Sequence, residues 1–206
     1  MFNRHSKTFK ELEQHRSIED CFYLCDYFPY SDWDFYESIG VLNEVGKDNS
    51  KIIMDLKYEP NPGNEEWRYQ KKQRAINAII TCLLDLLSID KNICVCVVPS
   101  SKKNNQYHGI TLVAKDLCKY RDNVEDGLDI IDKLYDTPQL HGNKGNRDYA
   151  NLKKSLSINT DLFRKDILLL DDIITTGQSV RIVKDLLIKN NANKVYTLAV
   201  GKTFYL

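Results

Sequence analysis

The stretch Asp166-Ile-Leu-Leu-Leu-Asp-Asp-Ile-Ile-Thr-Thr-Gly-Gln-Ser179 decides the fold of this 206-residue chain. Its apolar run, residues 167–170, is typical of a buried parallel strand, and the run ends in two adjacent acids, Asp171 and Asp172. A Thr-Thr-Gly turn follows, and after Gly177 the apolar residues recur at helical spacing. The order of strand, acidic pair, tight turn and helix predicts a ligand-binding edge of an open α/β sheet.

The residue types of this segment suit a sugar phosphate. A helix that begins after the turn presents backbone N–H groups without partners, and its dipole favours an anion there. The hydroxyls of Thr175, Thr176 and Ser179 add donors, and Gly177 allows the backbone to approach a phosphate closely. The carboxylates can accept hydrogen bonds from the two hydroxyls of a ribose. The alternative is structural, because an acidic pair after a strand also caps helices and Thr-Thr-Gly is a common turn.

Outward from this segment, strands alternate with helices, which predicts a mostly parallel sheet flanked by helices. Residues 136–150 break the pattern and contain two glycines and a proline. A loop of this length inside a compact domain is often a functional lid, and we expect a lid here. The expected helices are 64–88, 108–120 and 178–190, and Asn190 and Asn191 can close the last one in the left-handed conformation. The expected strands are 93–99, 129–135, 166–171 and 194–200.

Residues 1–60 are rich in aromatic side chains and irregular in pattern. They predict an N-terminal extension or hood within the same compact unit, followed by a core at 61–206. The aromatic side chains are interpreted as a packed layer, and the alternative is a surface for a homodimer or a protein partner.

Composition excludes several classes of protein. Acidic and basic residues balance at 29 each, so the charge does not indicate a nucleic-acid partner. No window approaches the roughly 18 apolar residues of a membrane helix, and the polar N-terminus does not resemble a secretory signal. A cytoplasmic protein without a membrane segment is therefore expected.

The six cysteines are scattered and contain no CxxC pair. Cys94 and Cys96 alternate in an apolar run and should share one face of a strand. Cys21 and Cys25 would meet on a helical turn as half of a zinc site, but no second pair follows them. Reduced structural thiols are the preferred interpretation.

The string LLLDDIITTGQS (168–179) resembles the binding signature for phosphoribosyl pyrophosphate (PRPP) of type I phosphoribosyltransferases. The resemblance implies the fold of that family, with Asp171 and Asp172 on the ribose hydroxyls and the turn around the 5-phosphate. Residues implied for the 5-phosphate are Thr175, Thr176, Gly177, Gln178 and Ser179. It also implies Mg²⁺, held at Asp171 and Asp172 through the PRPP hydroxyls or water.

Further segments are similar to the ComF-like subgroup, the competence-associated phosphoribosyltransferases of bacteria. The helix ending Leu56-Lys57-Tyr58 and the set Gln139, Arg147 and Asn151 resemble that subgroup. Residues Ser100, Ser101, Lys102 and Lys103 stand in the place of its pyrophosphate loop. Tyr107-His108-Gly109-Ile110 stands where that subgroup has Arg-Gly-Phe-Asn.

The resemblance implies a transferase that uses PRPP as donor and a nitrogenous compound as acceptor, with release of pyrophosphate. The reaction breaks the anomeric C–O bond, so cations must surround the leaving group. Lys144 and Arg147 in the 136–150 loop are candidate catalytic residues beside Asp171 and Asp172, although a solvated basic loop is the alternative. His108 and His141 are interpreted as solvated loop residues.

A second hypothesis comes from a different class of protein. A phosphoribosyltransferase-fold protein without turnover would bind PRPP or a nucleotide monophosphate and act through a partner in DNA uptake, processing or defence. A Rossmann dinucleotide protein is excluded because no GxGxxG follows the first strand.

Overall fold

The computed structural model describes residues 17–18, 21–57, 65–89, 91–103, 108–137 and 149–205. Within these residues the main sheet has six strands in the order β1-β2-β8-β7-β3-β4. Every pair of neighbouring strands is parallel except β1–β2. The strands are β1 (Ser17–Ile18), β2 (Cys21–Tyr27), β3 (Ile93–Val97), β4 (Val124–Asp126), β7 (Asp166–Ile174) and β8 (Lys194–Thr203).

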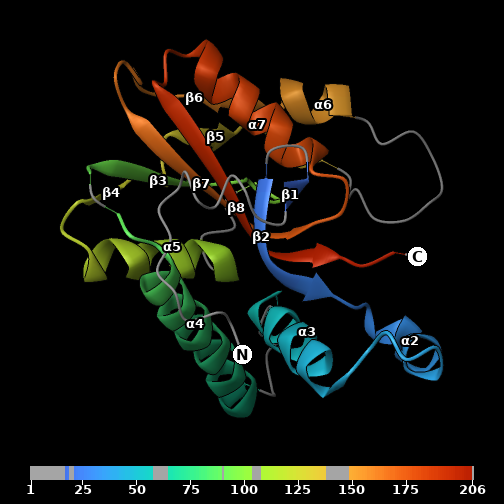
Figure 1. Cartoon of the computed structure of the whole chain (residues 1–206). Helices are drawn as coiled ribbons and strands as arrows, with labels where there is room; N and C mark the ends of the chain where they lie inside the picture. Colours follow the sequence, from blue (N-terminus) through green and yellow to red (C-terminus); the bar gives the residue numbers. More distant parts are fainter. Residues whose placement is uncertain are drawn as a thin grey trace.

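Helices cover both faces of this sheet (Figure 1). On one face lie α3 (Glu44–Lys57), α4 (Glu65–Leu86) and α5 (Gly109–Tyr120). On the other lies α7 (Gln178–Lys189), with α6 (Tyr149–Lys154) beside it. A separate antiparallel pair, β5 (Ile131–Lys133) and β6 (Leu156–Ile158), lies on the α7 side. The predicted α/β architecture, a mostly parallel sheet flanked by helices, is confirmed.

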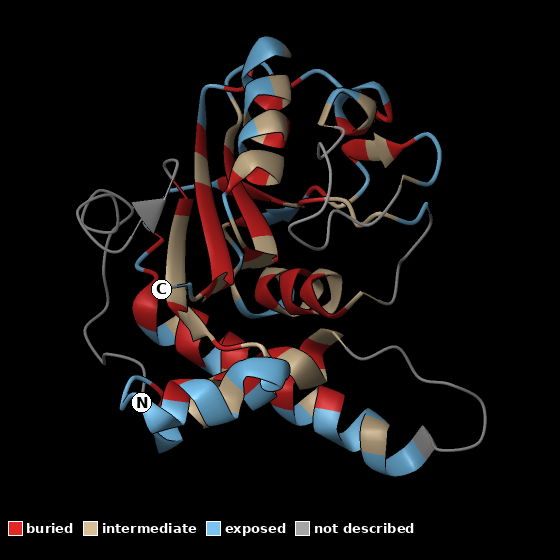
Figure 2. Cartoon of the chain, turned by 90° about the vertical axis from the view of Figure 1, so that its right-hand side faces the viewer, coloured by how far each residue is buried: buried red, intermediate tan, exposed pale blue. Residues whose placement is uncertain are grey.

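The alternation of side chains along β7 builds two apolar layers. Leu168 and Leu170 are buried among residues of α3, α4 and α5, whereas Ile167 and Leu169 are buried among residues of α7. Figure 2 shows these buried strands between the helices. Strand β7 is paired with β3 up to Leu170, and its last residues, from Asp171 to Ile174, are paired with β8 alone.

Most predicted elements after residue 64 match the structure closely. The long helix, the strand at 93–97 and the helices α5 and α7 differ from their predicted bounds by at most a few residues. Asn191 has a φ of 70°, which is the left-handed conformation predicted after α7. The sequence pattern missed the short β4, β6 and α6, which have too few residues for a clear period.

The irregular pattern expected for residues 1–60 is wrong for the described part of that region. It contains β2, the 3-10 turn η1 (Tyr30–Asp32) and α2 (Trp33–Ser38), together with α3, which agrees with the helix that the resemblance implied before Tyr58. Strand β2 pairs with β8 and belongs to the main sheet. The sequence did not predict this strand, because its apolar and aromatic residues do not alternate with polar ones. The division into 1–60 and 61–206 stays a prediction.

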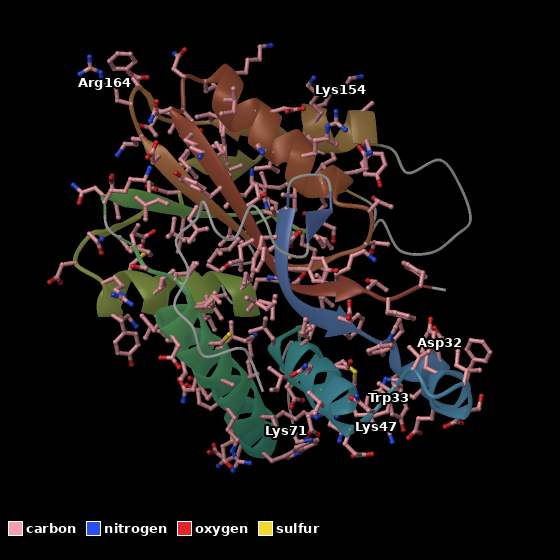
Figure 3. The ribbon with its side chains drawn as sticks, in the orientation of Figure 1. Asp32, Trp33, Lys47, Lys71, Lys154 and Arg164 are labelled. Carbon is pink, nitrogen blue, oxygen red and sulfur yellow. The ribbon has the colours of Figure 1, made fainter. Side chains whose placement is uncertain are left out.

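The aromatic residues after β2 form a small cluster at one corner of the molecule. Phe28, Tyr36 and Leu42 are buried there, with Trp33 and Phe204 packed against them. Figure 3 places Asp32 and Trp33 at this corner beside Lys47 of α3. The predicted packed layer is therefore present in this part, although Tyr30 and Phe35 are exposed.

The cysteines are free thiols, and five of the six are buried. Cys94 and Cys96 lie in the same apolar layer, as predicted. Cys21 and Cys25 lie on strand β2, so the helical turn expected for them is wrong. Burial and, to a smaller extent, the charge of Asp171 raise the pKa of Cys21 to about 12. Among the described helices, none is long and apolar enough to span a membrane.

Candidate functional site

The carboxyl end of β7 runs directly into a turn and then into helix α7. Gly177 is the N-cap of α7, with a φ of 77° and ψ of −2°. This left-handed conformation suits glycine, because a side chain there strains the backbone. Arg181 N donates to Gly177 O at 2.9 Å, which closes the first turn of α7. Thus the predicted sequence of strand, turn and helix N-terminus is present, with first-turn N–H groups directed toward the turn.

The hydroxyls of the turn lie near two other elements. Thr175 Oγ1 lies 3.5 Å from Thr203 Oγ1 at the end of β8, and Thr176 Oγ1 lies 3.4 Å from Tyr149 Oη at the start of α6. Thr176 is exposed, whereas Thr175, Gln178 and Ser179 are half-buried. The five residues predicted to hold a 5-phosphate thus span the turn, Thr175 to Gly177, and the first two residues of α7.

Asp171 and Asp172 differ in their surroundings, although their carboxyl groups are also hydrogen-bonded to each other. Asp171 continues the row of Ile167 and Leu169, and its charge acts on Cys21 in the same layer. Asp172 is 6% exposed, and its Oδ2 lies 3.5 Å from both Lys57 Nζ and His108 Nε2 on the α3 and α5 side.

Each carboxylate also accepts a hydrogen bond from the backbone. Asp172 N donates to Asp171 Oδ1 at 2.9 Å, and Ile173 N donates to Asp172 Oδ1 at 2.6 Å. Burial raises the pKa of Asp171 well above its ordinary value, and the neighbouring charge of Asp172 raises it further. The bond from Asp172 N and the charge of Lys57 offset only part of this effect.

Lys57 and His108 reach Asp172 from the ends of two helices. Lys57 is the last residue of α3, and His108 is the N-cap residue of α5. A Cβ atom on Gly109 would stand 2.2 Å from Leu56 O, so the two helix ends meet because residue 109 is glycine. The expectation of a solvated His108 is wrong, since its side chain is only 20% exposed. Neither segment carries a sequence pattern that predicts a contact with Asp172.

The segment predicted to bind pyrophosphate follows β3 at the same edge of the sheet. Val98 N donates to Leu170 O at 2.9 Å, so this segment starts beside the residue that precedes Asp171. Lys102 N donates to Ser100 Oγ at 3.3 Å, and Lys103 N donates to Asp136 Oδ1 at 2.6 Å. The side chains of both lysines are exposed. Four predicted residues, Ser100 to Lys103, thus lie on one loop that leaves β3 beside Leu170 and is hydrogen-bonded to Asp136 and Thr137.

A buried lysine near this loop was missed by sequence reasoning. Lys133, at the end of β5, is 5% exposed, and its Nζ donates to Thr137 Oγ1 at 2.9 Å. Burial lowers the pKa of Lys133. Thr137 N in turn donates to Ser101 O at 2.8 Å. No signal in the short segment 131–133 distinguishes this lysine from a solvated one.

Several predicted residues lie outside the described part of the chain. Lys144 and Arg147, the candidate catalytic cations, fall within residues 138–148, together with Gln139 and His141. Asn151 is described, and it accepts a hydrogen bond from Tyr135 Oη at 3.1 Å. The predicted lid therefore stays a prediction.

The described residues contain no group of three or more His, Cys, Asp or Glu side chains that could hold a metal ion. At the acidic pair, the donors are two carboxylates from adjacent residues. Mg²⁺ is commonly bound by one or two carboxylates together with phosphate oxygens and water, rather than by a cage of side chains. Asp171 and Asp172 fit that mode, in which the ligand supplies most of the oxygens.

Comparisons with solved structures give slight likenesses. The chain is similar to a purine phosphoribosyltransferase from Pyrococcus horikoshii Ot3, at 18% identity and a TM-score of 0.37, over 66% of this chain and 84% of that one. It is similar to a hypoxanthine-guanine phosphoribosyltransferase from Bacillus anthracis, at 12% identity and a TM-score of 0.36, over 77% and 73%.

A third likeness is to a phosphoribosylpyrophosphate synthetase from Mycobacterium smegmatis, at 18% identity and a TM-score of 0.34, over 62% of this chain. The chain spans 33% of the length of that synthetase. TM-scores and identities this low carry no inference about this chain. No family model matches the sequence, and no curated protein matches it.

Proposed function

We propose that the protein is a Mg²⁺-dependent phosphoribosyltransferase of the type I fold, which transfers phosphoribosyl from PRPP to a nitrogenous acceptor and releases pyrophosphate. One observation carries the proposal: the LLLDDIITTGQS string occupies the carboxyl end of a central parallel strand, with Gly177 left-handed at the N-terminus of α7. The carboxyl end of a parallel strand and a helix N-terminus are the surroundings that suit a ribose phosphate, and they support the proposal.

In this proposal the turn and the acidic pair hold opposite ends of the ribose phosphate. The first-turn N–H groups of α7 and the hydroxyls of Thr175, Thr176 and Ser179 would bind the 5-phosphate. Asp171 and Asp172 would accept hydrogen bonds from the ribose hydroxyls, directly or through bound Mg²⁺. Ser100 to Lys103 would contact the pyrophosphate, since Val98 and Leu170 are hydrogen-bonded where the two segments meet.

The reaction requires little covalent chemistry from the protein. The bond from C1 of the ribose to the pyrophosphate oxygen breaks with its electrons leaving on pyrophosphate, and the acceptor nitrogen forms the new bond to C1. The acceptor proton is released. The protein residues would hold the ribose and stabilise the negative charge that grows on pyrophosphate. Bound Mg²⁺ would supply further positive charge to the same oxygens.

Pyrophosphate release tests the transfer step. The full chain is incubated with PRPP, Mg²⁺ and each of a panel of nitrogenous bases and amines, and pyrophosphate is measured with a coupled phosphatase assay. We expect release with at least one acceptor, dependence on Mg²⁺, and a loss of about 100-fold or more in Asp172→Asn, because a charged hydrogen-bond partner of the ribose is removed. PRPP binding without release by any acceptor would contradict transfer and support the alternative, a PRPP-binding or nucleotide-binding protein.

A further inference from the structure

Lys133, the last residue of β5, buries a side chain that normally carries a positive charge. It is 5% exposed, and among the described residues its Nζ donates to a neutral hydroxyl, Thr137 Oγ1, at 2.9 Å. Burial lowers the pKa of Lys133, and the charge of Asp136 offsets part of this effect. A buried ammonium group on a hydroxyl loses more hydration than this one hydrogen bond restores, so it costs stability.

The surroundings of Lys133 would suit an apolar side chain. Ile131 points to the same side of β5, because it stands two residues earlier, and it is buried in the apolar layer that contains residues of α7. Leu156, which stands opposite Lys133 on β6, is buried in the same layer. A methionine could fill this place without the cost of burying a charge. The stability of the fold therefore does not account for a lysine here.

The contacts of Lys133 lead to the loop 100–103, which follows β3. An ammonium group has N–H donors only, so Thr137 Oγ1 accepts the bond from Lys133 and keeps its own proton for another acceptor. Thr137 Oγ1 donates over 3.5 Å to Ser101 O, the same oxygen to which Thr137 N donates at 2.8 Å. Lys133 therefore sets the direction of a hydroxyl that helps to hold the Ser101 carbonyl.

Holding this carbonyl fixes a peptide plane inside the loop. In a trans peptide the C=O and the following N–H point in opposite directions, so the N–H after Ser101 faces away from Thr137. A second contact comes from the same segment, where Lys103 N donates to Asp136 Oδ1 at 2.6 Å. Residues 133–137 thus hold the loop at two successive peptides.

We propose that Lys133 is a positioning residue for the loop 100–103, which it orients through Thr137. The inference rests on the proposed function, in which this loop contacts the pyrophosphate of PRPP. Lys133 keeps the Ser101 peptide in one orientation before the ligand arrives, so that binding does not have to order the loop. Its loss therefore weakens the binding of PRPP but not that of ribose 5-phosphate, which has no pyrophosphate.

Amide hydrogen exchange on the ligand-free full chain tests the contact between the two segments. In Lys133→Met and Thr137→Val, the protection of the amides of residues 103 and 137 should fall at least about tenfold, because a hydrogen bond that orders the segment is lost. Thr137→Ser keeps the hydroxyl and should retain the wild-type protection. The amides of residues 166–170 in β7 report on the whole fold and should not change.

Calorimetric titration of the same proteins with PRPP and Mg²⁺, and separately with ribose 5-phosphate, tests the role in binding. Lys133→Met should bind PRPP at least about tenfold more weakly and ribose 5-phosphate as tightly as wild type. Lys133→Met should also unfold at a urea concentration no lower than that of wild type, because a buried charge is removed. The matched control is Lys72→Met, which removes an equally buried lysine of α4 and should leave the affinity for PRPP unchanged.

Unchanged protection of amides 103 and 137 in Lys133→Met would overturn the proposal, whether or not the protein binds PRPP. A fall in protection that leaves the affinity for PRPP intact would also overturn it. Equal losses of affinity for PRPP and ribose 5-phosphate, or a loss of protection that extends to β7, would show general loosening of the fold and have the same consequence. A wild type that binds neither compound would instead contradict the proposed function, and hydrogen exchange would still test the contact.

Discussion

At the scale of single residues, Asp171 and Asp172 are adjacent in the chain but differ in their partners. Asp172 faces Lys57 and His108, whereas Asp171 faces the layer that contains Cys21. Burial and the charge of Asp172 raise the pKa of Asp171, so the folded protein holds a proton there more tightly than the unfolded chain does. An ionised Asp171 therefore destabilises the folded state.

Asp171→Asn is expected to stabilise the protein and to weaken PRPP binding. The pKa of Asp171 is higher in the folded protein than in the unfolded chain, where it is about 3.9. The free energy of unfolding of wild type therefore falls as the pH rises from the unfolded pKa toward the folded pKa, and Asp171→Asn removes this loss. The gain in the free energy of unfolding should therefore be small near pH 4 and larger at pH 7. Urea unfolding of both proteins at the two pH values measures it, and a gain that shrinks with rising pH would contradict the account.

Asp172→Asn is the matched substitution of opposite sign. It removes the carboxylate that faces Lys57 and His108, so it should lower the free energy of unfolding at pH 7, on the order of 1 kcal/mol for a partly exposed pair. The same urea experiment measures this change. A stability gain as large as that of Asp171→Asn would show that the two surroundings do not differ.

The sequence predicted the acidic pair and the turn but not the partners of the pair. Asp171, Asp172 and Gly177 lie in one continuous string, so local chemistry sufficed to single them out. Lys57 and His108 stand more than 60 residues before the pair, and their approach depends on packing between two helices. No local pattern encodes that contact, and the buried Lys133 was missed for the same reason.

At the scale of elements, the contact between α3 and α5 is the tightest constraint near the site. A Cβ on Gly109 would stand 2.2 Å from the backbone oxygen of Leu56. The two atoms would overlap at this distance, so the backbone of one of the two helices would have to shift. We expect Gly109→Ala to lower the free energy of unfolding by about 2 kcal/mol, the usual cost of overpacking. Chemical denaturation measures it.

The control for that substitution is Thr111→Ala, which shortens a half-buried side chain in the same turn of α5. Gly109→Ala should also move His108 away from Asp172. If Gly109→Ala and Thr111→Ala unfold at the same denaturant concentration, the close approach of α3 and α5 is not a tight constraint on the fold.

The long elements were predictable because periodicity and composition agree in them. In α4 the apolar residues Ile76, Ile79, Ile80 and Leu83 are buried at helical spacing, as the sequence predicted. Strand β2 was not predictable, because its aromatic residues read as an irregular cluster and its partner β8 lies some 175 residues later in the chain. Pairing over that separation is a property of the assembled sheet.

At the scale of the whole molecule, the thiols report the packing of both apolar layers. Five of the six cysteines are buried, and burial raises the pKa of Cys21 and of Cys82 to about 12. Cys118 is half-buried, and its pKa is raised to about 11. Since the thiolate is the reactive form, Cys21, Cys82 and Cys118 react slowly near neutral pH. The hydrogen bond with Cys96 lowers the pKa of Cys94, but Cys94 is buried and a reagent does not reach it.

A thiol-reactive dye at pH 8 should therefore label at most Cys118 in the native protein and all six cysteines after unfolding in guanidinium. Mass spectrometry of the labelled protein counts the sites. The control is Cys118→Ser, which should leave the native protein almost unlabelled. Rapid labelling of Cys21 or Cys82 in the native state would show that the layers are looser than described.

Binding of ribose 5-phosphate tests the central claim, that the turn after β7 is a sugar-phosphate site. We expect saturable binding of one ribose 5-phosphate per chain by calorimetry. We also expect a loss of at least about tenfold in affinity in Gly177→Val, because a branched side chain strains the left-handed turn that presents the N–H groups. The contradicting result is a wild-type protein that binds neither ribose 5-phosphate nor PRPP, or a Gly177→Val variant that binds both as tightly as wild type.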